Sequence, residues 1–156
     1  MNTTQIGLDT KMTKVLITDL NELLANFQVY YQNLRGLHWN IKGKSFFELH
    51  VKFEEFYTDS QEKIDMIAER ILTLGGAPMH TFADYTDNAS VRVGKDISND
   101  VEAVKLVLHA LTELLKIERR ILNSSDQAED EGTNAMMSDL IAEQEKTVWM
   151  LNAWLN

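Results

Sequence analysis

Apolar residues recur in alternating steps of four and three along four long stretches of the chain, and this periodicity restricts its fold most. Such steps place side chains on one stripe of an α-helix. With one Pro and seven Gly in 156 residues, few turns interrupt the stretches. Four stripes predict an all-α chain folded as a four-helix bundle. They run over Leu16–Leu37, Phe46–Leu74, Ile97–Leu122 and Met137–Leu155.

The connections between these stripes are marked by turn and capping residues. Ser45 and Glu48 have capping-box spacing at the start of the second helix, and Gly75, Gly76 and Pro78 follow its end. About twenty residues then separate the second stripe from the third, which is too long for a tight turn. Within them, Thr81 and Asp84 predict a short extra helix that lies across the bundle.

The last connection and the two chain ends complete the predicted organisation. Residues 123–132 form a short, strongly acidic connection between the last two helices. Residues 1–156 are expected to form a single domain, with residues 1–10 as a flexible N-terminal tail. The first residues lack the charged-then-apolar order of a signal peptide, and no apolar run approaches the roughly 20 residues of a membrane span. A cytoplasmic protein with no membrane contact is therefore expected.

Composition excludes several functional classes. The chain has no Cys, which rules out disulfide scaffolds and thiolate zinc or iron–sulfur centres. Its 15 Lys and Arg stand against 24 Asp and Glu, a formal net charge of −9. This charge repels nucleic acid unless a local basic patch overrides it, and it suits a protein that handles cations.

Two histidines and two acids stand at the edges of the predicted apolar stripes. His38 lies near the end of the first helix and His50 in the first turns of the second. Asp65 and Glu69 lie further along the second helix, four residues apart and hence on one face. Imidazole and carboxylate without sulfur suit iron, manganese or zinc. The alternative is that these residues are ordinary polar caps and solvated faces.

Helix geometry restricts how such a metal site is built. His50 and Asp65 are fifteen residues apart, and a rise of about 1.5 Å per residue separates them by roughly 22 Å. One chain therefore cannot bring both to one ion, and a shared site must lie between two subunits. An isologous two-fold contact would create two such sites in each dimer. The residue three before each His is never Glu, so the Glu-x-x-His pairs of an intrachain di-iron site are absent.

At these positions the chain resembles the Dps family, the mini-ferritins. The resemblance rests on His38-Trp39-Asn40, on His50 twelve residues later, on Asp65-Met-Ile-Ala-Glu69-Arg70 and on the Gly pair that follows. It spans essentially the whole chain. It implies a ferritin-like four-helix bundle with the short extra helix between its second and third helices, and assembly of the subunits into a hollow dodecameric shell.

The resemblance also implies an activity and a set of ligands. The family oxidises Fe(II), typically with hydrogen peroxide, and stores ferric mineral inside the shell, which protects against oxidative stress. His38 and His50 of one subunit would bind iron with Asp65 and Glu69 of its partner across a two-fold interface, and Glu54 would help hold a second, weaker iron. Trp39 would either take up oxidising equivalents or pack in the interface.

The acidic connection offers a further, weaker prediction. Asp126, Asp130 and Glu131 stand where members of the family place acids around three-fold pores through which iron enters. Such a ring concentrates cations. Ala135 stands where related chains often carry another acid, and the alternative is a solvated loop whose charges favour a helix N-terminus.

DNA condensation is the alternative function. Phosphate contacts come from Lys and Arg, but residues 1–14 contain only Lys11 and Lys14, and the chain ends at Asn156 without a basic tail. We therefore expect the shell not to bind DNA appreciably near neutral pH.

Overall fold

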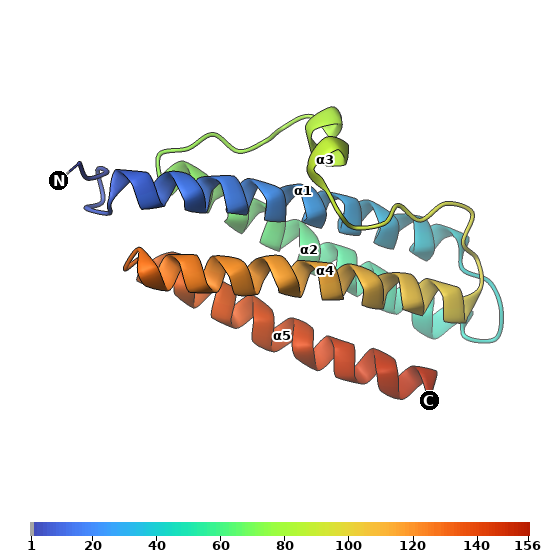
Figure 1. Ribbon diagram of the computed structural model, residues 1–156. Coiled ribbons are helices and arrows are strands. Elements are labelled where there is room, and N and C mark those ends of the chain that lie inside the picture. Colours follow the sequence, from blue (N-terminus) through green and yellow to red (C-terminus); the bar gives the residue numbers. More distant parts are fainter. Residues whose placement is uncertain (1) are drawn as a thin grey trace.

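Four long helices lie side by side and a fifth, short one lies against them (Figure 1). The computed structural model describes residues 2–156, and Met1 lies outside the described residues. The helices are α1 (Thr10–Asn40), α2 (Phe46–Thr73), α3 (Phe82–Asn88), α4 (Asp100–Gln127) and α5 (Glu131–Leu155). The predicted all-α bundle with a short extra helix is confirmed.

Short turns make neighbours of α1 with α2 and of α4 with α5, and α1 also packs against α4. The long connection between α2 and α4 returns along the bundle, and α3 within it packs on α1 (Figure 1). Thr81 caps α3 as predicted, because its side chain accepts a hydrogen bond from the backbone N–H of Asp84. The hydroxyl of Tyr85 donates to the main-chain oxygen of Met79 and holds the helix to the preceding loop.

The predicted stripes form one hydrophobic core. Leu16, Leu20, Leu23 and Leu34 of α1 are completely buried, as are Phe53 and Ile67 of α2 and Ile121 of α4. Each fully buried side chain of this kind contributes about 1.5–3 kcal/mol. The core therefore holds α2 as one continuous helix over its 28 residues, which fixes the separation of the polar side chains along it.

Two helix ends have the same hydrogen-bonding pattern with different residues. After α2, Gly75 donates to Leu72 and Gly76 donates to Ile71, with Gly75 at a φ of 88°. After α4, Glu129 donates to Asp126 and Asp130 donates to Ser125, with Glu129 at a φ of 55°. Both are Schellman ends, which require a left-handed residue. At the second, Glu takes the place that glycine usually fills.

Two local features differ from the sequence prediction. Ser45 precedes α2 but makes no side-chain capping bond, because its backbone (φ −92°, ψ 17°) is not extended. The connection between α4 and α5 is only residues 128–130, since α4 continues to Gln127. Within residues 1–10, for which a flexible tail remains a prediction, the backbone N–H of Thr4 donates to the main-chain oxygen of Leu8 and that of Thr10 donates to Asn2.

Candidate metal centre

His38 and His50 face each other across the α1–α2 corner. Their rings are stacked, with centroids 3.8 Å apart and planes within 10°. Nδ1 of His38 lies 2.6 Å from the main-chain oxygen of His50, and Nδ1 of His50 lies 2.7 Å from the main-chain oxygen of His38. A carbonyl oxygen only accepts, so both Nδ1 atoms carry a proton and donate. In the neutral form of each ring the lone pair then lies on Nε2, which is the tautomer that a metal ligand needs.

Aromatic rings hold this pair on both sides. Phe46 stacks on His50 with centroids 4.9 Å apart, and Tyr57 meets His38 edge to face at 5.5 Å. His38 is buried and His50 half-buried. The imidazoles are therefore fixed before any metal binds, a requirement for a precise ligand geometry.

The two carboxylates lie near the other end of α2. The side chains of Asp65 and Glu69 are exposed, as is that of Met66 between them. In Figure 1 the α1–α2 corner and the end of α2 are at opposite ends of the bundle. The structure does not bring these acids to the histidines of the same chain, and residues 2–156 contain no cluster of three or more His, Cys, Asp or Glu suited to a metal ion. A single chain thus holds the two histidines and the two carboxylates apart, at opposite ends of α2.

Two neighbours of the histidines are exposed. Glu54 lies one turn after His50 on α2 and faces solvent. Trp39 is 58% exposed, and the guanidinium of Arg35 lies 4.9 Å from its ring centroid. Trp39 thus presents a large aromatic side chain at the surface of the chain, next to His38 in the sequence.

The acids of the α4–α5 corner fall into two kinds. Asp126 and Glu131 are exposed. Asp130 is only 2% exposed and caps α5, accepting a hydrogen bond of 3.0 Å from the backbone N–H of Thr133. It also accepts a hydrogen bond of 2.6 Å from Nη2 of Arg70. The carboxylate predicted to line a pore is therefore committed to contacts inside the chain, unlike those of Asp126 and Glu131.

The sequence prediction did not include a polar cluster inside the bundle. Glu118 of α4 is completely buried and accepts a hydrogen bond of 2.7 Å from Nε2 of Gln144 on α5. Burial raises the pKa of Glu118 to about 8, and the Gln144 bond and the charges of Lys63 and Arg119 limit the rise. One signal was present, since Gln144 stands at an apolar position of its stripe.

The remaining two histidines belong neither to the His38–His50 pair nor to the acidic α4–α5 corner. His80 is exposed in the loop after α2 and contacts the main-chain oxygen of Pro78. His109 lies on α4, beside the apolar stripe. His80 thus faces solvent, and His109 is half-buried at the edge of the core.

The bundle, its extra helix and the carboxylate and histidine side chains define a class of protein. Residues 17–156 match the family model of the ferritin-like domain, so the chain is a ferritin-like protein. A solved Dps protein of Vibrio cholerae O1, described as a member of a broad superfamily of ferritin-like diiron-carboxylate proteins, superposes with a TM-score of 0.98. The two sequences are 52% identical, and the match covers 100% of this chain and 98% of the Vibrio cholerae chain.

Comparison with curated relatives identifies the family within the ferritin-like proteins. The DNA protection during starvation protein of Porphyromonas gingivalis is 41% identical over 95% of this chain and 93% of its own length. An uncharacterized protein of Haemophilus influenzae is 47% identical over 98% of this chain and 96% of its own length. The chain belongs to the Dps family. No helix within residues 2–156 is long and apolar enough to cross a membrane.

Proposed function

We propose that this protein oxidises Fe(II) at sites shared between two subunits, preferentially with hydrogen peroxide, and stores the ferric product inside a dodecameric shell. The observation that carries the proposal is the reciprocal pair of hydrogen bonds between His38 and His50, which leaves a lone pair on Nε2 of each ring. Membership of the Dps family supports the same activity.

The partner subunit supplies the carboxylates in this proposal. Asp65 and Glu69 lie fifteen and nineteen residues after His50 on one unbroken helix, so they are roughly 22 Å or more from it along the axis. An antiparallel two-fold packing of α2 on its mate brings the acids of one chain to the histidines of the other. The exposed apolar side chains of Trp39 and Met66 supply surface for this contact.

The donor set fits Fe(II) as a substrate. Two neutral imidazoles and two carboxylates suit a borderline divalent ion, and carboxylates stabilise the higher charge of Fe(III). Each Fe(II) gives up one electron, and the reduction of one peroxide molecule to water takes up two electrons and two protons. Glu54, one turn from His50, is proposed to help hold a second iron.

Entry and storage involve other acids of the chain. Asp126 and Glu131 are proposed to line a three-fold pore, and Asp130 is left out because Arg70 and Thr133 engage its carboxylate. A ring of exposed carboxylates focuses negative potential and draws cations inward. Because each chain has a net charge of −9, we propose that the shell takes iron and peroxide as its partners rather than DNA.

Mixing two inactive variants tests whether the site is shared. His50→Ala and Asp65→Ala chains are unfolded, mixed equally and reassembled, and Fe(II) oxidation by peroxide is recorded. In a mixed dimer one of the two sites keeps all four ligands, so the mixture recovers about one quarter of the parental rate. An intrachain site would recover nothing.

A matched mixture supplies the control. Parental chains are mixed equally with chains that carry both substitutions. A shared site retains about one quarter of the parental rate because only parental dimers stay intact, whereas an intrachain site retains about one half. Recovery of no activity in the first mixture together with one half in the second would refute the shared site.

A further inference from the structure

The interior of the bundle contains a polar cluster that the proposed two-fold site does not use. A cavity of about 30 Å³ lies among the long helices, and its lining includes Tyr30 of α1, Lys63 of α2 and Gln144 of α5. Glu118 of α4 is hydrogen-bonded to Gln144. Each of the four long helices thus contributes a polar side chain to this part of the bundle.

Lys63 is the cation of this cluster. Its side chain is only 11% exposed, and its Nζ contacts the carboxylates of Asp59 on α2 and of Glu143 on α5, the latter at 2.8 Å. One positive charge thus bridges two carboxylates, one from α2 and one from α5, whose side chains are 52% and 62% exposed. A bound metal ion makes the same kind of connection.

Two buried oxygen atoms of the cluster have no partner. Oε1 of Glu118 and Oε1 of Gln144 are both buried without a hydrogen bond. Glu118 is completely buried, and Gln144 is 4% exposed. Buried polar atoms without a hydrogen-bond partner are costly, so these atoms point to a position that a further polar group or a cation could occupy.

Ferritin-like proteins of other designs bind metal inside the bundle. Their intrachain di-iron sites are built from inward-facing carboxylates on all four helices. Here Glu118 remains as an inward carboxylate, but a lysine stands among the groups that would surround the ion. An ammonium group repels a divalent cation and already neutralises the acids that would hold it.

We propose that Lys63 acts as a built-in cation at the intrachain metal position of the bundle and thereby excludes divalent metal ions from the interior of each chain. Lys63 is in this sense a specificity-determining residue, because it confines metal binding to other parts of the protein. The proposal concerns the inside of one chain and does not depend on the two-fold site.

The test uses full-length chains in which His38→Ala and Asp65→Ala remove the proposed two-fold site. Binding of Co²⁺ is measured by equilibrium dialysis and by visible absorption, which reports the coordination of the ion. Lys63→Ala and Lys63→Met are each expected to gain one Co²⁺ per chain. Lys63→Arg, which keeps the charge, and Lys116→Ala, which removes an exposed ammonium group on α4, are expected to gain none.

A second substitution locates the bound ion. Adding Glu118→Gln to Lys63→Met is expected to weaken Co²⁺ binding by about tenfold or more, because Glu118 can give up its proton to become an anionic ligand when the ion binds, whereas Gln cannot. The proposal is overturned if folded Lys63→Met chains bind no Co²⁺. It is also overturned if chains that keep Lys63 bind a Co²⁺ ion that is lost with Glu118→Gln.

Stability provides a readout independent of the spectrum. Metal that replaces the ammonium group binds only the folded chain, so Co²⁺ should raise the thermal midpoint of Lys63→Met and not that of Lys63→Arg. If both uncharged variants fail to fold and Co²⁺ does not restore them, the proposal is also wrong.

Discussion

Nη2 of Arg70 donates a 2.6 Å hydrogen bond to Oδ1 of Asp130, and this contact joins the last turn of α2 to the start of α5. Nε of Arg70 donates to the hydroxyl of Thr133 at 2.9 Å. Gly132 makes room for the guanidinium, because a Cβ there would lie 2.7 Å from Nη2. Arg70, which follows Glu69 in the sequence, therefore fixes the position of the α4–α5 corner, where Asp126 and Glu131 lie.

Arg70→Ala is expected to lower the free energy of unfolding by about 3 kcal/mol, because it leaves the buried carboxylate of Asp130 without its cation. Urea denaturation followed by circular dichroism measures the change. Arg119→Ala is the control, since Arg119 pairs with Glu145 on the surface, and it should change stability by about 0.5 kcal/mol or less. Equal losses in the two variants would contradict the structural role of Arg70.

Glu118→Gln is expected to flatten the dependence of stability on pH. The pKa of Glu118 is about 8 in the folded chain, against an ordinary value of 4.5. The folded chain keeps this proton where the unfolded chain has lost it. Glu118 therefore stabilises the fold fully below about pH 4.5, and this contribution is lost at roughly 1.4 kcal/mol per pH unit as the pH rises to about 8.

The Gln variant has no such proton and offers Gln144 an N–H donor, so its stability relative to the parent should increase between about pH 5 and pH 8. Urea midpoints at the two ends of this range measure the difference. Glu145→Gln, at an exposed position of α5, serves as the control. Parallel curves for the parent and the Glu118 variant would show that Glu118 does not hold its proton.

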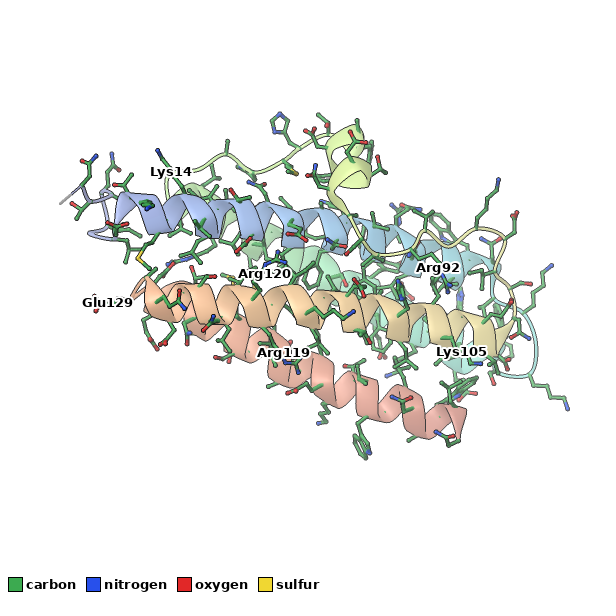
Figure 2. The ribbon with its side chains drawn as sticks, viewed as in Figure 1. Lys14, Arg92, Lys105, Arg119, Arg120 and Glu129 are labelled. Atoms are coloured by element: carbon green, nitrogen blue, oxygen red, sulfur yellow. The ribbon has the colours of Figure 1, made fainter. Side chains whose placement is uncertain are left out.

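Glu129→Gly is expected to stabilise the fold by about 1 kcal/mol, because Glu129 stands in the left-handed region at a φ of 55°. Its side chain projects outward at the α4–α5 corner (Figure 2), so little packing is lost. Gly75→Ala, at the equivalent position after α2, is expected to destabilise by a similar amount. Thermal midpoints of the two variants should shift in opposite directions, and shifts of the same sign would contradict the prediction.

His38→Ala combined with Asp65→Ala is expected to slow Fe(II) oxidation by peroxide by about tenfold or more, since loss of groups that merely orient ligands already costs about 10–100-fold. Stopped-flow absorbance gives the rate, and light scattering shows whether the assembly persists. His80→Ala removes an exposed imidazole from a loop and should keep the parental rate. An unchanged rate in the double variant would remove His38 and Asp65 from the proposed site.

The assembled protein is expected not to retard DNA in a gel shift at low salt near neutral pH. Each chain contributes a charge of −9, and several of its cations, such as Arg120 between α1 and α4 (Figure 2), are already paired with acids. A version with an added N-terminal run of lysines provides the positive control. Tight, salt-sensitive retardation of the unmodified protein would contradict this expectation.

The long helices followed from the sequence because one physical signal, apolar spacing, repeats through each of them. The α4–α5 corner could not be predicted from this signal. Gly132 suggested a boundary, but it lies in the first turn of α5, where its missing side chain accommodates Arg70. The left-handed residue that ends α4 is Glu129, which carries no turn signal in the sequence.

The candidate site was predictable to the extent that it depends on spacing along one helix. The separation of His50 from Asp65 follows from helical rise alone, and α2 is unbroken as that reasoning requires. Contacts between distant segments were not readable, such as Arg70 with Asp130 or Lys63 with Glu143. A charged residue in an amphipathic pattern looks solvated until its partner on another helix is known.

The opposite placement of imidazoles and carboxylates on α2 has a consequence for the timing of activity. If the proposed function is correct, a newly synthesised chain does not oxidise Fe(II), because its histidines and its carboxylates lie at opposite ends of α2 and form no complete site. Oxidation begins only when a second copy docks, so at concentrations near the dimer dissociation constant the rate per chain rises with protein concentration. On this proposal, the protein would begin to oxidise iron only when the shell that encloses the product has begun to assemble.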